Sequence, residues 1–390
     1  MLDFDFFSPT RFVFGAGRES EVGDCVKSVG GSRVLIHFGG GSVVSSGLLA
    51  RVVQSLNSAG IFSIQLGGVA PNPRDSLIRE GIELCRREKI DLVLGIGGGS
   101  AIDSAKAIAI GTCYDGDFWD LYVRKATPLK RLLLGTILTL PATGTEGSNS
   151  SVVKNESLKI KRGLRSDLNR PDFSILNPEL TYTLPAWQIA CGASDILAHI
   201  LERYFSGTED DELTDRLCEA TMISVIESAV EALKNPTSYS PRANLMWAST
   251  IAHNGTLGVG REEDWSVHAL EAELGGWYDT AHGAGLAALY PAWLQFMLQH
   301  KPRRVTQLAN RVFGVTDGTE GIRKLASFYL SLGLPVNLRE LGVRLEDLTA
   351  LSARVKRNPD GTCGHYLPLN DQEILEIYRL AFDLSFFSEE

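Results

Sequence analysis

The chain has 390 residues, of which 44% are hydrophobic and 8% aromatic, enough apolar material to fill the cores of two globular domains. Its 47 acidic residues outnumber its 38 basic residues, giving a formal net charge of −9, and no long basic run is present. This balance argues against nucleic acid or an anionic membrane as the partner, so we expect a soluble protein that acts on a small molecule.

The N-terminal segment MLDFDFFSPTRF lacks the features of a secretory signal, because it carries acids where bases are needed and has no continuous apolar core. The apolar stretches that begin at Leu132 and Gly285 are shorter than the ~20 residues that cross a bilayer. The six cysteines are scattered without a CxxC pair, a pattern typical of reduced thiols. We therefore expect a cytoplasmic protein with no membrane-spanning segment.

Short apolar runs alternate with helical patterns over the first part of the chain. The strand-like runs are SRVLIHFGGG, FSIQLGGV, DLVLGIGGGS and LLLGTILTL. Helical patterns such as SGLLARVVQSLNSAG and SLIREGIELCRREK separate them. This alternation predicts a parallel sheet covered by helices.

A glycine turn follows the first of these strands, in VLIHFGGGSVVSSG. Gly39, Gly40, Gly41 and Ser42 form the turn, and no acid lies in it. In dinucleotide folds an acid after a strand commonly binds the ribose 2′-hydroxyl of NAD and repels a 2′-phosphate. The neutral turn therefore favours NADP over NAD, although a plain loop turn would have the same composition.

A second glycine turn lies in DLVLGIGGGSAIDSAKAIAIG. The apolar run Leu92–Ile96 leads into Gly97–Gly99, and a helical pattern follows. A phosphate could bind where that helix starts, because free N–H groups and the helix dipole favour negative charge, and Ser100 adds a hydroxyl. Lys106 could reach a phosphate or a neighbouring carboxylate, such as that of Asp103. The turn by itself is equally consistent with tight strand–helix packing.

A domain boundary is predicted between Pro178 and Pro185, in LNPELTYTLP, where two prolines flank an irregular segment. Beyond it strand signals nearly vanish, and long helical patterns cover residues 212–233 and 243–257. We expect a dinucleotide-binding, Rossmann-like α/β domain over residues 1–183 and an all-helical, metal-binding domain over residues 184–390.

An acid-and-imidazole set in the second domain suits one divalent metal. Asp195 and His199 stand four apart, so they project from one helix face. His268 lies on a second predicted helix, which we expect Gly275–Gly276 to end, so that the chain turns and brings His282 back. Three imidazoles and a carboxylate suit Zn²⁺ or Fe²⁺. The alternative is that these are ordinary surface or core residues, as most such pairs are.

Several motifs together resemble the iron-containing (group III) alcohol dehydrogenases, on the branch of butanol dehydrogenases and NADPH-dependent aldehyde reductases. GGGSAIDSAK resembles the GGGSxxDxxK phosphate signature of the family, and LTLPATGTEGS resembles its threonine-rich cofactor segment. APNP (residues 70–73), TRFVFGAG and LPLNDQEILEIY are similar to further family segments, so the resemblance covers the whole chain.

The resemblance implies that Asp195, His199, His268 and His282 hold the catalytic metal, Fe²⁺ or Zn²⁺. It also implies that the cofactor contacts come from a set of small and polar residues in the first domain: Gly40, Gly41, Ser42, Asn72, Gly98, Gly99, Ser100, Asp103, Thr139, Thr143, Ser148 and Lys159. Without the family, the two threonines would be interpreted as strand residues. His37 lies outside these motifs and is interpreted as structural.

The activity that the resemblance implies is reversible hydride transfer between NADPH, or NADH, and a short- to medium-chain aldehyde, in a homodimer. One position departs from several relatives: where they place a histidine four residues after the third ligand, this chain has Ala272. A proton relay through that position is therefore not expected.

Two other hypotheses remain open on the sequence. One is a lyase or polyol enzyme of the same superfamily, similar to dehydroquinate synthase or glycerol dehydrogenase, since one fold permits several chemistries. The other is a non-catalytic protein that keeps the fold and binds the cofactor.

Overall fold

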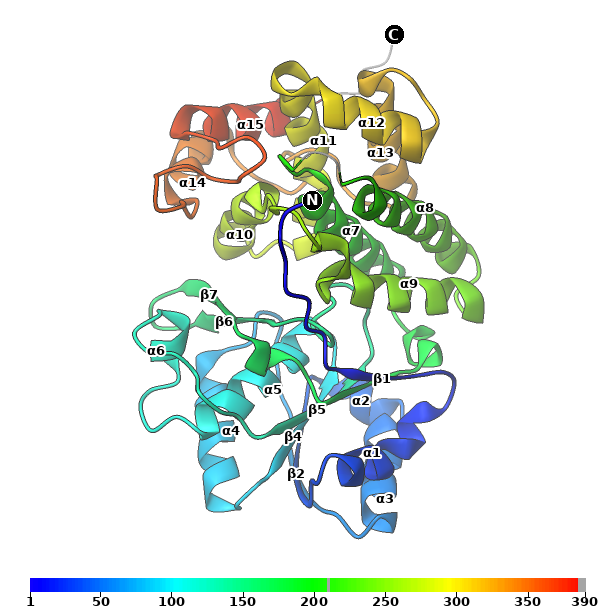
Figure 1. Ribbon diagram of the computed structural model, residues 1–390, viewed down its shortest axis with the longest axis vertical. Helices are drawn as coiled ribbons and strands as arrows, with labels where there is room; N and C mark the ends of the chain where they lie inside the picture. The colour runs from blue at the N-terminus through cyan, green and yellow to red at the C-terminus, as the bar shows by residue number, and fades with distance from the viewer. Residues whose placement is uncertain (209–210, 385–390) are drawn as a thin grey trace. The chain divides into compact units, whose positions relative to one another are not determined.

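The computed structural model describes residues 1–208 and 211–384 (Figure 1). The chain forms two compact units. Phe7–Thr183 and Ser249–Asn254 make up one, the sheet unit; Met1–Phe6, Leu184–Ala248 and Gly255–Glu390 make up the other, the helical unit. Two short segments, Met1–Phe6 and Ser249–Asn254, thus belong to a different unit from the residues next to them in the chain.

The sheet unit is built on a six-stranded parallel sheet in the order β1-β8-β5-β4-β2-β3. Its strands are β1 (Arg11–Phe14), β2 (Arg33–Phe38), β3 (Phe62–Leu66), β4 (Leu92–Gly97), β5 (Leu133–Leu138) and β8 (Phe173–Leu176). Every residue of β4 is buried, as expected of a parallel strand covered on both faces. The four strands expected from apolar runs are present, and the parallel α/β class is confirmed.

Four strands were not anticipated from the sequence pattern. β1 and β8 have four residues each, too few for a clear period. β6 (Ser150–Asn155) and β7 (Ile160–Arg165) form a separate antiparallel hairpin. The buried positions of β6 are Ser151, Val153 and Asn155, so its alternation of burial leaves no apolar period in the sequence.

Helices cover both faces of the sheet: α1 (Val22–Ser28), α2 (Gly41–Ser45), α3 (Leu48–Ser58), α4 (Asp75–Arg87), α5 (Gly99–Thr112) and α6 (Trp119–Tyr122). Val34 and Ile36 of β2 pack with Val52 of α3 on one face. Leu35, between them, packs with Ile108 of α5 on the other. The period of two along the strand thus divides the core into two apolar layers.

The neighbouring strands β2 and β4 mark the point where the chain changes sides. β2 leads into α3, whose side chains join one core layer, whereas β4 leads into α5, whose side chains join the other. In open α/β sheets such a switch point leaves a crevice beyond the carboxyl ends of the strands, where ligands bind. Both glycine turns of the sequence lie at this point.

His37 ties three elements together inside the sheet unit. Its side chain is fully buried; Nδ1 donates to the main-chain oxygen of Leu66 at 2.9 Å, and Nε2 accepts from the hydroxyl of Ser104 at 2.7 Å. Burial lowers the pKa of His37 to about 4, so the ring is neutral in the folded protein. This agrees with the structural role expected for it.

The regular structure of the helical unit is α-helical: α7 (Ala186–Tyr204), α8 (Glu212–Lys234), most of α9 (Tyr239–His253), α10 (Ser266–Tyr278), α11 (His282–His300), α12 (Pro302–Phe313), α13 (Gly318–Ser331), α14 (Leu348–Arg354) and α15 (Asp371–Asp383). Among its described residues the only β-type pairing is an isolated bridge between Cys363 and Leu369. α11 is buried along most of its length and packs against α7, α10, α13 and α15.

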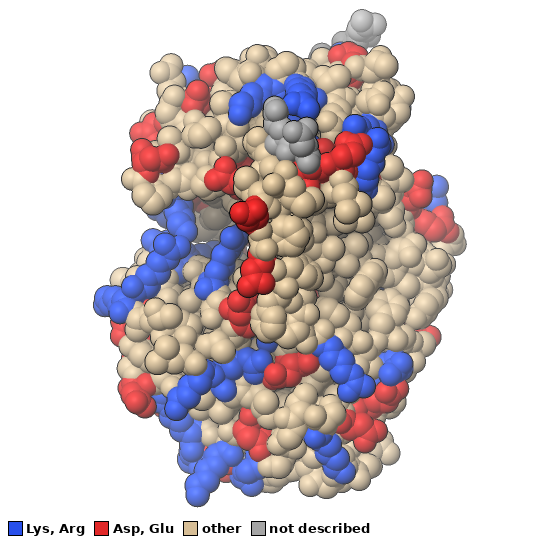
Figure 2. Space-filling view, viewed as in Figure 1, with Lys and Arg blue, Asp and Glu red and all other residues tan. Residues whose placement is uncertain are grey.

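Acidic and basic side chains are interspersed over the face shown in Figure 2, with Lys and Arg gathered where Figure 1 places the β6–β7 hairpin. That hairpin and its turn contribute five cations: Lys154, Lys159, Lys161, Arg162 and Arg165. Across the residues that the structure describes, none of the helices has the length and apolarity needed to span a membrane.

We predict that His37 makes the stability of the chain depend on pH. The folded protein keeps it neutral down to about pH 4, whereas an unfolded chain protonates it below its ordinary pKa of 6.5. Its contribution is therefore complete above that value and is lost as the pH falls toward 4, amounting to about 2 kcal/mol by about pH 5.

Urea unfolding of metal-free protein at about pH 8 and about pH 5 measures this effect. His37→Gln should flatten the pH dependence by about 2 kcal/mol, while His300→Gln, at an exposed position, should keep the dependence of the parent. Equal pH dependence in the His37→Gln variant and the parent would contradict the prediction.

Candidate metal centre and nucleotide-binding turns

Asp195 and His199 lie in the middle of α7, a long helix that is buried over most of its residues. Their exposed fractions are 3% and 5%. His199 Nδ1 lies 2.8 Å from the main-chain oxygen of Asp195, one turn earlier, and 3.2 Å from Oδ1 of the same residue. The bond to the carbonyl places the proton on Nδ1, so Nε2 is the acceptor atom of the ring.

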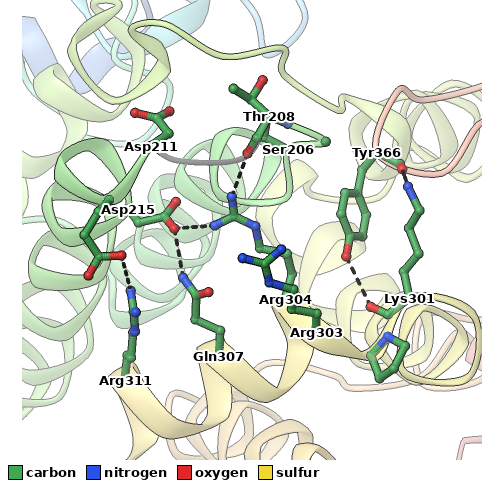
Figure 3. Close-up of a pocket in the computed structure, with 13 residues that line it drawn as sticks. Ser206, Thr208, Asp211, Asp215, Lys301, Arg303, Arg304, Gln307, Arg311 and Tyr366 are labelled. Carbon is green, nitrogen blue, oxygen red and sulfur yellow. Dashed lines mark hydrogen bonds and ion pairs between the residues drawn. The ribbon is translucent and has the colours of Figure 1, made fainter. Parts of the chain in front are cut away.

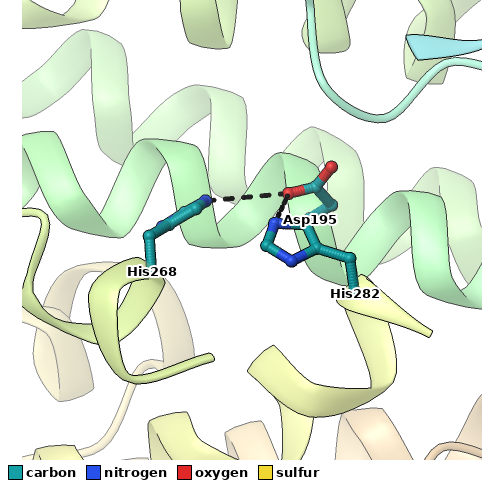
Figure 4. Close-up of side chains that lie close together, drawn as sticks. All are labelled: Asp195, His268 and His282. Carbon is teal, nitrogen blue, oxygen red and sulfur yellow. Dashed lines mark ion pairs between the residues drawn. The ribbon is translucent and has the colours of Figure 1, made fainter. Parts of the chain in front are cut away.

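Asp195, His268 and His282 converge from three helices (Figure 4). Each offers one ligand atom, and these atoms all lie within 4.8 Å of one another. Asp195 Oδ1 is 3.8 Å from His268 Nε2 and 3.5 Å from His282 Nε2. His268 belongs to α10, and His282 is the first residue of α11. The structure thus brings three of the four expected ligands into a group able to hold one ion.

His199, the fourth expected ligand, adjoins this group without belonging to the three-residue set. Its ring centroid lies 4.7 Å from that of His268. The sequence prediction therefore identified residues that are neighbours in space.

Two further carboxylates orient the histidines. Glu202 Oε1 accepts from His268 Nδ1 at 2.8 Å and from the backbone N–H of His268 at 2.9 Å. Glu271 Oε2 accepts from His282 Nδ1. With Nδ1 of both rings engaged, Nε2 is the atom left to bind a ligand. Metal-binding histidines commonly donate their other N–H to a carboxylate in this way, so the donor set suits a divalent ion.

Two buried atoms of the group lack a hydrogen-bond partner, Asp195 Oδ1 and His268 Nε2. Buried polar atoms are nearly always satisfied, and an unpaired carboxylate oxygen facing an unpaired imidazole nitrogen is costly unless a cation lies between them. The arrangement therefore fits a bound metal ion better than a closed hydrogen-bond network.

The charges of the group are strongly coupled. Burial would raise the pKa of Asp195, but His199 and His282 hold it well below its usual range. Burial would lower the pKa of His268, but the carboxylates of Asp195 and Glu202 raise it to about 9. A cation is thus favoured here, and a metal that binds His268 must displace a proton.

The end of α10 differs from the prediction. Gly275–Gly276 lie inside the helix, which continues to Tyr278 and ends at Asp279 in the left-handed conformation, with φ 55°. A glycine within a helix costs only about 1 kcal/mol relative to alanine, and packing can override that preference. The return of the chain to His282 is therefore set by Asp279, not by the glycine pair.

The second glycine turn lies against the threonine-rich segment. Gly98 precedes α5 and Gly99 begins it. A Cβ atom on Gly99 would approach the side chain of Thr143 to 2.8 Å, and one on Gly98 would lie 3.1 Å from Leu140. The backbone N–H of Thr139 donates to the oxygen of Gly97 at 2.9 Å. Glycine is required for this close approach, which places the two predicted cofactor segments side by side.

The first glycine turn has more room. Gly40 precedes α2, and Gly41 and Ser42 begin it. Added Cβ atoms on Gly40 and Gly41 would meet nothing within 4 Å, and one on Gly39 would lie 3.7 Å from the oxygen of Val69. Asn72 adopts the left-handed conformation, with φ 57°, in the segment that follows β3. This open turn and the turn after β4 both lie at the carboxyl ends of neighbouring parallel strands.

Three of the expected cofactor residues have other surroundings. Asp103 accepts from Thr145 Oγ1 at 2.6 Å and from the backbone of Val152 at 2.9 Å. Ser148 is 1% exposed, and its hydroxyl oxygen lies 3.4 Å from Lys106 Nζ. Lys159 is exposed in the turn of the β6–β7 hairpin. As the structure has them, Asp103 and Ser148 anchor the cofactor segment, and their contact with a cofactor stays a prediction.

Lys106 points into the protein. Its Nζ donates to Thr145 Oγ1 at 2.7 Å and to the main-chain oxygens of Ser148 and Ser150 at 3.1 Å and 2.7 Å. Burial lowers its pKa to about 8, although Asp103 opposes the shift. The described hydrogen bonds of this lysine go to a hydroxyl and to main-chain oxygens, and Asp103, one of the two partners considered for it, acts on it through charge and shares Thr145 with it.

A separate cavity of about 390 Å³ lies in the helical unit beside α8 and α12 (Figure 3). Its cations already have partners: Arg304 pairs with Asp215, Arg311 with Glu219 at 3.2 Å, and Lys301 with a main-chain oxygen. The cavity is thus lined by a closed ion-pair network, and we assign it a structural role.

Sequence reasoning missed Glu202 and Glu271. Both follow a ligand by three residues, Glu202 after His199 and Glu271 after His268. Glu202 also stands seven residues after Asp195, which keeps it on the same face of α7. That helical spacing was the available signal.

Family models match both halves of the chain. The model described as iron-containing alcohol dehydrogenase matches residues 9–178. The model described as the C-terminal part of the Fe-containing alcohol dehydrogenase family matches residues 189–382.

The names of individual relatives agree with the two family models. NADH-dependent butanol dehydrogenase A of Clostridium acetobutylicum is 40% identical, covering 98% of this chain and 100% of its own. The NADPH-dependent aldehyde reductase YqhD of Escherichia coli is 33% identical, covering 92% and 94%. The crystal structure of NADH-dependent butanol dehydrogenase A from Thermotoga maritima has a TM-score of 0.95 at 37% identity, covering 98% of this chain and 99% of that one.

We predict that Glu202→Ala weakens metal binding about 10- to 100-fold, because His268 loses the acceptor that fixes its ring. Titration of metal-stripped protein with Zn²⁺ against a chromophoric chelator measures the dissociation constant. Glu273→Ala is the matched control, since Glu273 lies on α10 but pairs with Arg354 at 2.9 Å. An unchanged affinity in Glu202→Ala would show that the hydrogen bond is not needed.

Proposed function

The chain belongs to the iron-containing alcohol dehydrogenase family, and from this membership we propose that Asp195, His199, His268 and His282 hold one divalent metal, Fe²⁺ or Zn²⁺. The protein is an NAD(P)H-dependent alcohol dehydrogenase and aldehyde reductase. The lyase and non-catalytic alternatives have no support among these relatives, whose names are those of dehydrogenases and reductases.

One observation carries the assignment of the metal site. The buried Asp195 Oδ1 has no hydrogen-bond partner and lies 3.5 Å from His282 Nε2 and 3.8 Å from His268 Nε2. The other nitrogen of each ring is held by a glutamate. Asp195 Oδ1 and the Nε2 atoms of both histidines thus face one point, where a metal that displaces the His268 proton would bind.

The proposed reaction moves a hydride from C4 of the nicotinamide to the carbonyl carbon of the aldehyde, and back for the alcohol. When bound by the proposed ligands, a divalent metal would supply Lewis acidity toward the carbonyl oxygen. The residues of this chain supply orientation: Glu202 and Glu271 fix two imidazoles, and the glycine turns with the N-terminus of α5 hold the pyrophosphate. No protein nucleophile is required.

The proton that completes the alcohol does not come from position 272. Ala272 has no ionisable group, so solvent or a ribose hydroxyl of the cofactor is the proposed donor. The proposed substrates are short- to medium-chain aldehydes and the corresponding alcohols.

We assign residues 1–183 as the dinucleotide-binding domain and residues 184–390 as the metal-binding domain. The cofactor contacts are proposed at the two glycine turns, Asn72 and the threonine-rich segment, with Asp103, Ser148 and Lys159 as further members of the set. A homodimer in the cytoplasm is the proposed state.

NADPH is the proposed preference over NADH. The relatives named above include both NADH- and NADPH-dependent enzymes, so family membership leaves the choice open. The support is local: the turn after β2 carries no acid to repel a 2′-phosphate, and added atoms on Gly40 and Gly41 would meet open space.

The activity is tested with butyraldehyde, following oxidation of NADPH and NADH by absorbance, in metal-stripped protein reconstituted with Zn²⁺ or Fe²⁺. We expect metal-restored turnover with a preference for NADPH. His268→Ala should lose bound metal and turnover while its circular dichroism remains that of the parent, because the ligand is removed and the helices stay. Full activity in a metal-free His268→Ala variant would reject the site.

We predict that Gly39→Asp shifts the preference from NADPH toward NADH, because a carboxylate after β2 repels the 2′-phosphate and binds the 2′-hydroxyl. The backbone accepts the change, since the nearest atom to an added Cβ is 3.7 Å away. The ratio of kcat/KM for the two cofactors is the measurement. Gly39→Asn, of equal size but neutral, should keep the ratio closer to that of the parent; equal shifts in both variants would assign the effect to size.

A further inference from the structure

We infer that Trp265 is a positioning residue of the proposed metal centre, whose indole fixes the rings of His199 and His268 in the orientation that the metal requires. The inference rests on the proposed function, because it takes these two histidines as ligands. Trp265 itself offers no metal-binding atom.

The first support is the backbone of Trp265. It precedes α10 with φ 66° and ψ 13°, in the left-handed region. Glycine or asparagine adopts this conformation readily, whereas a bulky side chain there is uncommon and strained. Such strain persists only where surrounding contacts impose it, and it concentrates at functional sites. The contacts of this side chain therefore offset the cost of the unfavourable backbone conformation.

The second support is what the indole touches. Its ring lies 5.1 Å from the His268 ring at 65° and 5.9 Å from the His199 ring at 73°, both in edge-to-face geometry. Such pairs are favourable and directional. One aromatic plane therefore contacts two of the four proposed ligands, which belong to α10 and α7.

The third support is that the indole is held from both sides. Its Nε1–H donates to Glu263 Oε2 at 2.6 Å, and the Arg203 guanidinium carbon lies 4.9 Å from the ring centroid. Arg203 also pairs with Glu263 at 3.1 Å and donates to the main-chain oxygen of His199 at 2.7 Å. Arg203 of α7 therefore contacts the indole, the indole contacts the ring of His199, and Arg203 binds the main chain of His199 directly.

The consequence for binding is preorganisation. A hydrogen bond at Nδ1 fixes one edge of the His199 ring and of the His268 ring, and the indole restricts the rotation of both rings. A site whose ligands are fixed before the ion arrives binds more tightly than one that must order them. A merely structural tryptophan would instead contribute to stability without affecting metal affinity.

The test compares Trp265→Leu, Trp265→Phe and Trp265→Gly in the full chain. The control is Trp187→Leu, at a tryptophan that is 45% exposed on α7, the helix that carries His199. Metal-stripped proteins are titrated with Co²⁺ and Zn²⁺ by chelator competition, and the visible spectrum of the Co²⁺ form reports ligand geometry. Thermal unfolding of the metal-free proteins reports stability.

We expect Trp265→Leu and Trp265→Gly to weaken metal binding about 10- to 100-fold and to alter the Co²⁺ spectrum, while Trp265→Phe restores much of the affinity through its ring. At saturating metal, we expect the fold-decrease in kcat to exceed the fold-change in the KM for the aldehyde. Trp265→Gly, which relieves the backbone, should unfold no earlier than Trp265→Leu and still bind weakly.

Affinity within about twofold of the parent in Trp265→Leu would overturn the inference, as would loss of thermal stability without any change in affinity. Failure of the parent chain to bind a stoichiometric metal ion would instead reject the proposed function, so the two failures are distinguishable.

Discussion

The structure depends on the burial of three carboxylates, Asp195, Glu202 and Glu271, around histidine side chains in the helical unit. Taking an ionised carboxylate out of water costs several kcal/mol unless hydrogen bonds and opposite charge compensate it. Glu202 and Glu271 each accept from an imidazole N–H group, whereas one oxygen of Asp195 and one of Glu271 lack a hydrogen-bond partner. A divalent cation is the group that completes the balance. The packing of α7, α10 and α11 around this point thus stabilises the fold and forms the proposed metal site at the same time.

The sheet unit obeys a different constraint, the close approach of main chains at the carboxyl ends of the strands. Gly98 and Gly99 let the 139–143 segment lie directly against the start of α5, where a Cβ would collide with Thr143. Beneath this surface Lys106 binds three oxygens of the 145–150 segment and fixes its path. Rigid backbone N–H groups at a helix N-terminus follow from these two features, and they are what a pyrophosphate needs.

The sequence was sufficient for the features that recur with a period or a fixed spacing. Apolar runs located the central strands, and the spacing of Asp195 and His199 predicted that both lie on one helix, which is α7. The sequence pattern failed where long-range packing decides the structure. The four-residue strand β1 is too short to show a period, and α10 continues through Gly275 and Gly276 to its end at Asp279. Glu202 and Glu271 carried helical spacing that could have been used, whereas the strained backbone of Trp265 has no signature in the sequence.

The open space around Gly39 has a consequence for the history of such enzymes. Glycine and aspartate codons differ by a single base, and an added Cβ atom at Gly39 would meet only an ordinary contact, 3.7 Å from the oxygen of Val69. If the charge at this turn governs cofactor choice, one point mutation separates two metabolic roles, one linked to the biosynthetic pool of reducing equivalents and one to the catabolic pool. Lineages of this fold could then exchange one role for the other repeatedly without passing through an unstable intermediate.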